Sequence, residues 1–161
     1  GRNANLLEDA FKFAKMGGTI DLTCGESESK FHSVADAVKK AKKEGVPMEK
    51  VTMSSDGQGS WSNYDAEGKL VEIGVSDVDT IYRQIVYMVK EENMDLEELL
   101  ALGTKNPAMA LELYPKKGAV KEESDADILI MNEDLSLDTV IAMGVPMMRD
   151  GKILKKGTYE K

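Results

Sequence analysis

The residues best suited to chemistry lie in one short stretch, Ser54-Ser55-Asp56-Gly57-Gln58-Gly59-Ser60. The residues from Val51 to Ser55 favour a strand, and Asp56 follows directly after it. In parallel α/β architectures, active-site groups lie just beyond the carboxyl ends of strands. An aspartate in this position can bind a metal ion or act as a base, and the neighbouring glycines would let the backbone approach a ligand closely.

Ordinary turn chemistry is the main alternative for Asp56. An Asp-Gly pair is typical of tight hairpins, and Asp150-Gly151 is predicted to form one. A strand of a parallel sheet does not end in a two-residue hairpin, which favours a functional Asp56. A phosphate-binding loop is disfavoured because no Gly-Lys-Ser/Thr follows these glycines.

Other candidate reactive residues are few. His32 is the only histidine, and we expect it to be a solvated loop residue ahead of a helix cap at Ser33. Cys24 ends a predicted strand and is expected to be buried and unreactive, because a nucleophilic cysteine needs a nearby base. Trp61 could equally line a pocket or cover the core. A catalytic zinc usually takes three protein ligands rich in histidine, which this chain cannot supply alone.

Alternating helices and strands must position Asp56. The hydrophobic pattern predicts helices over residues 6–15 and 33–44, and short strands over 19–24 and 51–55. This order indicates parallel strands joined by right-handed crossovers, hence an α/β layer or barrel. The glycine-rich residues 58–77 are predicted to be an irregular functional loop.

The second half of the chain changes in character. Helices are predicted over residues 78–91 and 95–102, and a further helix is predicted to start at Pro107, a favoured first position. No helical period follows Lys117, so we place a domain boundary there. Residues 118–161 are predicted to form a small β unit that is too small to be stable alone.

Composition limits the class of protein. The chain has 161 residues, of which 42% are hydrophobic, enough to build a core. Its formal net charge of −8 disfavours nucleic acid and anionic membranes as partners. No run approaches eighteen apolar residues, so no membrane span is expected. A single cysteine fits a reducing, cytoplasmic setting.

Stretches along the whole chain resemble the amidohydrolase superfamily, and most closely the isoaspartyl (β-aspartyl) dipeptidases. The Ser-Asp-Gly strand end and the tail motif Asp125-Ala126-Asp127 resemble the superfamily, and the form Ser-Ser-Asp-Gly-x-Gly-Ser narrows the match to the dipeptidases. The other matching stretches are Arg2-Asn3, Gly17–Thr23, Gly68, Ile73–Val75, Asp150–Lys152 and Gly157–Tyr159.

The resemblance implies a (β/α)8 barrel, the TIM barrel of metal-dependent hydrolases, with part of a separate small β-sandwich domain. Residues 1–117 would supply the last β/α units of the barrel, and residues 118–161 the C-terminal part of the small β domain. Members cleave β-aspartyl dipeptides with one or two zinc ions, so zinc and a dipeptide are the expected ligands. Self-association or a preceding segment would cover the exposed barrel edges, so a homo-oligomer is expected.

The resemblance also gives roles to three residues. Asp56 matches the aspartate at the end of the last barrel strand, which binds metal and moves a proton from the attacking hydroxide to the leaving amine. Arg2 matches an arginine that pairs with a substrate carboxylate through its bidentate fork. Ser60 matches a serine that contacts the substrate.

The chain departs from the family pattern in lacking the His-x-His pair, the carboxylated lysine and two further histidines. We therefore expect the parent protein to be a zinc dipeptidase and this chain to be inactive alone. Two alternatives stay open. One is a related amidohydrolase, such as a dihydroorotase-like enzyme or a deacetylase, and the other is a non-catalytic assembly module.

Overall fold

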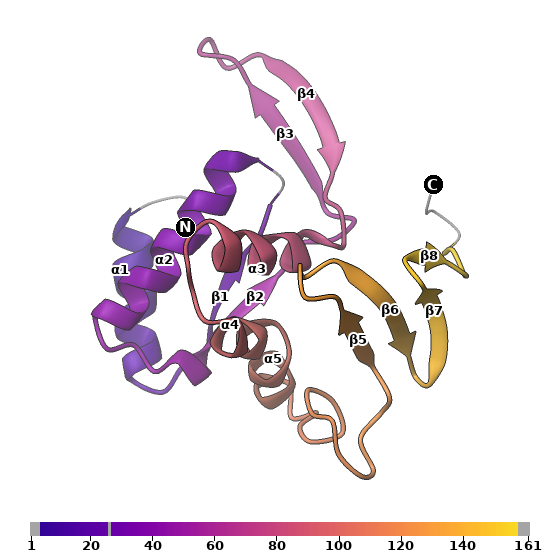
Figure 1. Cartoon of the computed structure of the whole chain (residues 1–161). Coiled ribbons are helices and arrows are strands. Elements are labelled where there is room, and N and C mark those ends of the chain that lie inside the picture. Colours follow the sequence, from indigo (N-terminus) through magenta and orange to yellow (C-terminus); the bar gives the residue numbers. More distant parts are fainter. Residues whose placement is uncertain (1–3, 26, 158–161) are drawn as a thin grey trace.

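The computed structural model describes residues 4–25 and 27–157, and its first half alternates between helices and strands (Figure 1). The elements are α1 (Ala4–Lys15), β1 (Ile20–Thr23), α2 (Glu28–Lys43), the 3-10 helix η1 (Met48–Lys50) and β2 (Val51–Ser54). β1 and β2 pair in parallel, with Ile20 opposite Val51 and Thr23 opposite Ser54. The expected order and the parallel pairing are confirmed.

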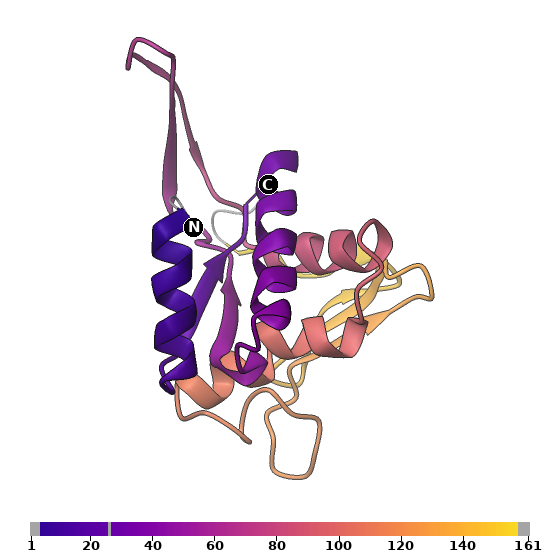
Figure 2. The same ribbon diagram turned by 90° about the vertical axis from the view of Figure 1, so that its left-hand side faces the viewer.

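The two faces of the β1–β2 pair differ in chemistry, because side chains alternate along a strand. One face packs into a core with side chains of α1 and α2, which run alongside the strands (Figure 2). Its strand residues are Ile20, Leu22, Val51 and Met53. The other face is polar and carries Asp21, Thr23, Thr52 and Ser54.

A β-hairpin follows β2, so the expectation of an irregular loop over residues 58–77 is wrong. β3 (Ser60–Tyr64) and β4 (Leu70–Val75) pair antiparallel, and the hairpin projects from the body of the molecule (Figures 1 and 2). Its tip is closed by Asp65, whose Oδ1 accepts hydrogen bonds from the backbone N–H groups of Glu67 (3.1 Å) and Lys69 (2.7 Å).

The glycines of this segment shape the hairpin instead of breaking it. Gly68 sits in the tip with φ of 80°, a left-handed conformation that glycine adopts without penalty. Gly74 lies opposite Trp61, and a Cβ added there would be 2.1 Å from the Trp61 ring. Trp61 therefore packs across the hairpin onto bare backbone.

Three helices follow, α3 (Thr80–Lys90), α4 (Leu96–Gly103) and α5 (Lys105–Ala110), as expected in number and approximate position. Two predicted helix starts are wrong. α2 is capped by Ser27, whose Oγ accepts from Lys30 N at 3.2 Å, and not by Ser33. α5 starts two residues before Pro107, which is tolerated because the first four N–H groups of a helix have no intrahelical partner.

The tail forms one antiparallel sheet in chain order, β5 (Ile128–Met131), β6 (Leu137–Ala142), β7 (Val145–Arg149) and β8 (Lys152–Ile153). Asp150 and Gly151 join β7 to β8 with φ of 50° and 69°, so the predicted hairpin turn is confirmed. Tyr82 of α3 donates a hydrogen bond to Leu135 O at 2.8 Å, which ties the sheet to the helices.

The Asp125-Ala126-Asp127 motif has a structural role in this tail. Asp127 Oδ1 accepts a hydrogen bond from Met143 N at 2.7 Å, which fixes the turn between β6 and β7. Lys117 Nζ lies 3.0 Å from Asp125 Oδ2 and 2.5 Å from Asp127 Oδ2. These contacts hold the first sheet strand against the segment that leaves α5, and hydrogen bonds from Lys117 and Met143 keep the pKa of Asp127 below its usual range.

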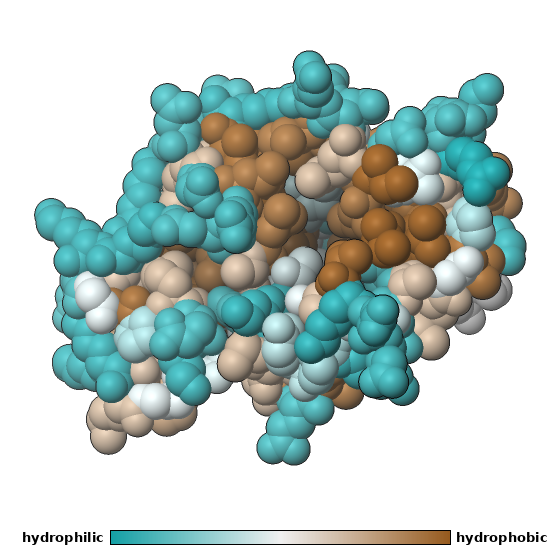
Figure 3. Space-filling view, turned by 60° about the horizontal axis from the view of Figure 1, so that its bottom comes forward, coloured by the Kyte–Doolittle hydropathy of each residue, from teal (hydrophilic) through white to brown (hydrophobic). Residues whose placement is uncertain are grey.

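Apolar side chains also gather outside the main core. A cavity of about 200 Å³ lies between α3, α4 and β5, and its lining includes Val86, Leu100, Leu129 and Met131. Figure 3 shows apolar surface bordering a hollow on the underside of the molecule. Within the described residues, no helix combines the length and the hydropathy needed to cross a membrane.

Candidate active site

Asp56 lies two residues beyond the last residue of β2, at the carboxyl end of the parallel pair. Its φ of 50° is in the left-handed region, which aspartate and asparagine tolerate better than most residues. The turn is fixed by a hydrogen bond from Gly59 N to Asp56 O (2.8 Å) and another from Gly57 N to Ser55 Oγ (3.1 Å). The strand-end position predicted for Asp56 is therefore what the structure has.

The Asp56 side chain is exposed and lies over Gly59. A Cβ added at Gly59 would be 2.7 Å from Asp56 Oδ1 and 2.9 Å from its Cγ, so the carboxylate occupies space that only glycine leaves open. Within residues 4–25 and 27–157, no side chain or backbone N–H donates a hydrogen bond to this carboxylate. Its oxygens are available to a metal ion or a proton.

Ser60 is the first residue of β3 and is exposed. The base of the hairpin is clamped by hydrogen bonds from Gln58 N to Ser76 O (2.8 Å) and from Ser76 N to Gly59 O (2.9 Å). This clamp keeps Asp56 and Ser60 on one short segment at the strand end. Arg2 lies outside the described residues, so its predicted contact with a substrate stays a prediction.

Asp21 is a further polar residue below this turn, on the polar face of β1 and β2. Its Oδ1 accepts a hydrogen bond from Thr52 Oγ1 at 2.8 Å, and its Oδ2 accepts one from Ser54 Oγ at 2.5 Å. Asp21 was not among the residues predicted from the sequence. The alternation Ile20-Asp21-Leu22-Thr23 carries the signal, because it places polar side chains on the strand face that turns away from the helices.

Cys24 is buried beside the strand ends, as predicted. Its backbone N–H donates to Ser54 O at 2.8 Å and so extends the pairing of β1 with β2. Burial, with a smaller effect of the Asp21 charge, raises the pKa of the Cys24 thiol to about 12. The thiol is therefore protonated at neutral pH and unsuited to act as a nucleophile.

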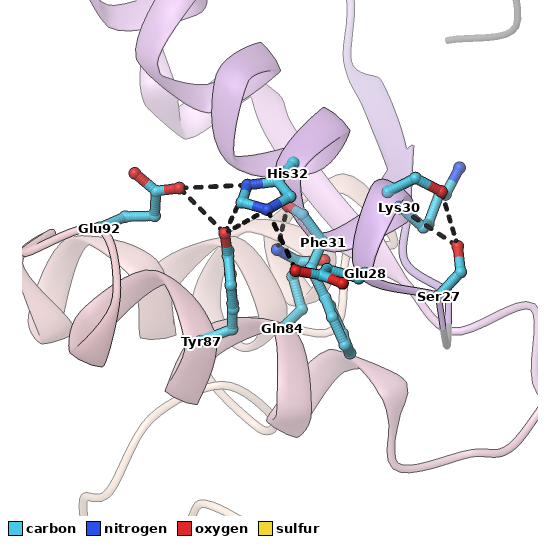
Figure 4. Close-up of polar contacts among 9 residues, drawn as sticks. Ser27, Glu28, Lys30, Phe31, His32, Gln84, Tyr87 and Glu92 are labelled. Carbon is cyan, nitrogen blue, oxygen red and sulfur yellow. Dashed lines mark hydrogen bonds and ion pairs between the residues drawn. The ribbon is translucent and has the colours of Figure 1, made fainter.

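His32 lies in the second turn of α2 and not in a loop, so its predicted placement is wrong. Its Nδ1 is 2.6 Å from Tyr87 Oη, and the two rings meet edge to face (Figure 4). Tyr87 Oη also donates to Glu92 Oε1 at 3.0 Å, and Glu92 forms an ion pair with Lys39. These contacts fasten α2 to α3, so the cluster is structural.

The pKa values of the cluster follow from these contacts. Desolvation, followed by the hydrogen bond to Glu92, raises the pKa of Tyr87 to about 12. Hydrogen bonds from Lys39 and then Tyr87 hold the pKa of Glu92 below its usual range. At neutral pH the cluster therefore contains a neutral phenol and an ionised carboxylate.

Asp56 fits one position in a metal site. Zinc sites of hydrolases combine histidine nitrogens with carboxylate oxygens. The described part of the chain contains no group of three or more His, Cys, Asp and Glu side chains placed to hold a metal ion. Among the described residues the carboxylate of Asp56 has no hydrogen-bond donor, and it is exposed, so it could serve as a single ligand.

Comparisons with known proteins show what this chain is similar to. The chain matches the amidohydrolase family over residues 4–154. The β-aspartyl dipeptidase of Fervidobacterium islandicum AW-1, solved in complex with a β-Asp-Leu dipeptide, is 35% identical with a TM-score of 0.83. That match covers 99% of this chain and 41% of the dipeptidase. A second structure of a dipeptidase from this organism is 32% identical, with a TM-score of 0.76. That match covers 99% of this chain and 38% of the dipeptidase.

A more distant structure shares the fold alone. The N-acetylglucosamine-6-phosphate deacetylase of Pasteurella multocida is 16% identical with a TM-score of 0.59 over 81% of this chain and 37% of the deacetylase. The chain thus spans about two fifths of the length of the dipeptidases that it matches. Its fold is that of part of an amidohydrolase barrel with a small β domain. This chain belongs to the amidohydrolase family.

Proposed function

We propose that this chain is the C-terminal part of a zinc-dependent isoaspartyl dipeptidase, which hydrolyses β-aspartyl dipeptides. The observation that carries the proposal is the free carboxylate of Asp56 at the end of a parallel strand, in a chain 35% identical to a β-aspartyl dipeptidase. That relative was solved with β-Asp-Leu, which makes a β-aspartyl dipeptide the proposed substrate.

The three predicted site residues would each have a separate role in the reaction. Asp56 would bind zinc and hold the proton that passes to the leaving amine. Zinc would supply a Lewis acid and an activated water at neutral pH. Ser60 would contact the substrate from the first position of β3, and Arg2 would pair with its carboxylate.

The same proposal covers the organisation of the protein. Residues 1–117 would belong to the barrel and residues 118–161 to the small β domain. In the described chain, β1 and β2 each have one unpaired edge, which the rest of the barrel would cover. The exposed Val71 and Ile73 of the hairpin support a homo-oligomer. The single cysteine supports a cytoplasmic location.

The isolated chain would be inactive, because Asp56 is its one metal-site residue. A direct assay of the 161-residue chain with zinc and β-Asp-Leu tests this. Turnover by the isolated chain would contradict the proposal that the ligand set is shared with a longer protein. Binding to a partner without any turnover by the longer protein would favour the assembly module instead.

The decisive experiment is Asp56→Asn in the full-length protein. Asparagine suits the left-handed backbone at this position, so the substitution removes the charge without adding strain. We expect kcat for β-Asp-Leu to fall by about 100-fold to 10,000-fold, the range for a lost proton-transfer group. The bound zinc, measured by mass spectrometry, should fall as well.

Asp150→Asn is the matched control, because Asp150 has the same φ of 50° in an Asp-Gly turn. It should retain the activity and zinc content of the unsubstituted protein. Full activity of Asp56→Asn would disprove the role of Asp56. Hydrolysis of cyclic amides or acetylated sugars, with no cleavage of β-Asp-Leu, would assign the protein to another amidohydrolase activity.

A further inference from the structure

The polar face of β1 and β2 departs from the usual filling of a parallel barrel. The interior of such a barrel is normally packed with bulky branched side chains such as valine, isoleucine and leucine. In this chain the strand face that turns away from the helices carries Asp21, Thr23, Thr52 and Ser54. Asp21 is exposed in the described chain, but inside a closed barrel it would need hydrogen-bond donors, because burial of an unpaired charge is costly.

Both oxygens of Asp21 have such a donor on the neighbouring strand. Thr52, directly opposite in the register, reaches Oδ1, and Ser54, two residues further, reaches Oδ2. Thr52 Oγ1 also lies 3.2 Å from Ile20 O, whereas Ser54 Oγ donates to the carboxylate alone. The distance of 2.5 Å from Ser54 Oγ to Asp21 Oδ2 is that of a close hydrogen bond, so Asp21 holds Ser54 firmly.

The segment between Ser54 and Asp56 is thus held from two sides. Asp21 holds Ser54 from the polar face, and Thr80 Oγ1, fully buried at the start of α3, lies between Ser55 O (3.4 Å) and Asp77 O (3.3 Å) and can donate to either. Asp56 follows at once and is fixed in the left-handed region. The position of its carboxylate therefore depends on where Ser54 is held.

We propose that Asp21 is a positioning residue for the active site, which holds the end of β2 through Ser54 and Thr52 and so sets the position of the Asp56 carboxylate. Asp21 acts through β2 and contacts neither the substrate nor the metal. The inference rests on the proposed function, since Asp56 must matter to the reaction for its position to matter.

The test compares Asp21→Ala with Asp21→Asn in the full-length protein. For Asp21→Ala we expect kcat on β-Asp-Leu to fall by about 10- to 100-fold, since a misplacement of about 1 Å costs about 100-fold. KM should stay within about twofold, because the substrate contacts are elsewhere. Asp21→Asn should recover kcat to within about threefold, because an amide can accept one hydroxyl and donate to the other.

A second readout does not depend on turnover. Hydrogen exchange in the peptide covering residues 54–60 should be faster in Asp21→Ala and unchanged in Asp21→Asn. Asp36→Asn removes an exposed acid of α2 and is the matched control, with unchanged kinetics and exchange. If Asp21→Ala does not fold, Ser54→Ala is the alternative, because it removes one of the two hydrogen bonds. It should show a smaller fall in kcat and a smaller rise in the exchange rate of residues 54–60.

Several results would overturn the proposal. Unchanged kcat and unchanged exchange in Asp21→Ala would mean that Asp21 does not position the turn. An equal loss in Asp21→Asn, with a shifted pH profile of kcat, would assign the effect to charge instead of hydrogen bonding. A rise in KM alone would place Asp21 at the substrate. Failure of the unsubstituted protein to cleave β-Asp-Leu would count against the proposed function, and the exchange data would still decide the role of Asp21.

Discussion

Substitution of Gly59 by alanine tests whether the space beside the Asp56 carboxylate matters. An added Cβ would be 2.7 Å from Asp56 Oδ1 and 2.8 Å from Asp56 O. The first distance is about 0.7 Å less than the 3.4 Å at which ordinary contact begins. The carboxylate can rotate away, but the carbonyl is backbone and accepts the 2.8 Å hydrogen bond from Gly59 N. The turn must therefore shift.

The size of the effect follows from that shift. The carbonyl contact of 2.8 Å is about 0.6 Å short of 3.4 Å, and at about 100-fold per ångström of misplacement a movement of that size lowers kcat by roughly 10- to 30-fold. The crowding itself should cost about 1–3 kcal/mol of folding free energy. Steady-state kinetics on β-Asp-Leu measure the change in kcat, the melting temperature measures the change in stability, and the zinc content of the full-length protein shows whether metal binding is affected.

Gly68→Ala is the matched control for this prediction. Gly68 lies in the tip of the same hairpin, with φ of 80° and no atom within 4 Å of an added Cβ. Alanine there should cost about 1 kcal/mol through backbone strain alone and leave kcat unchanged. If Gly59→Ala keeps the kcat and zinc content of Gly68→Ala, the reasoning about the carboxylate position is refuted.

Other predictions concern stability and reactivity. Asn106→Ala should cost about 2–4 kcal/mol in urea unfolding, because the buried amide donates to two backbone carbonyls at 2.8 Å that would lose their partner; a smaller loss would mean that water replaces it. Hydrogen bonds from Lys39 and then Tyr87 lower the pKa of Glu92 in the folded protein. The stability that Glu92 contributes is therefore present above the pKa of glutamate in the unfolded chain, and it is lost as the pH falls through the folded pKa. The stability advantage over Glu92→Gln should therefore shrink below about pH 4.3, and an advantage independent of pH would contradict this. Cys24, whose pKa burial raises to about 12, should react with iodoacetamide at pH 8 only after unfolding.

The strand end that holds Asp56 could be predicted from sequence because its determinants are local. Val51–Ser54 is a short run that ends in Asp-Gly, and the helix before it implies a crossover to a parallel neighbour. The site roles of Asp56, Ser60 and Arg2 came from motif resemblance and stay predictions. No local rule shows whether an aspartate binds a metal, because the partners of a metal ligand need not be close to it in sequence.

The features that the sequence did not reveal depend on contacts between distant residues. The hairpin requires Trp61 to meet Gly74, and a glycine-rich composition conceals that pairing. Ser27 and Ser33 are both good caps, and the extra turn of α2 gains Phe31 and His32 contacts with Tyr87, more than fifty residues away. Tertiary packing decided each case.

The projecting hairpin also bears on how proteins with this fold can diversify. Because Asp65 closes the tip and Gln58 and Ser76 close the base, the strands between can grow or shrink with both ends sealed. Evolution could alter this arm without disturbing the turn that carries Asp56. A protein engineer has the same freedom, since a recognition loop or fluorophore grafted at the tip would be carried by an arm that begins at Ser60.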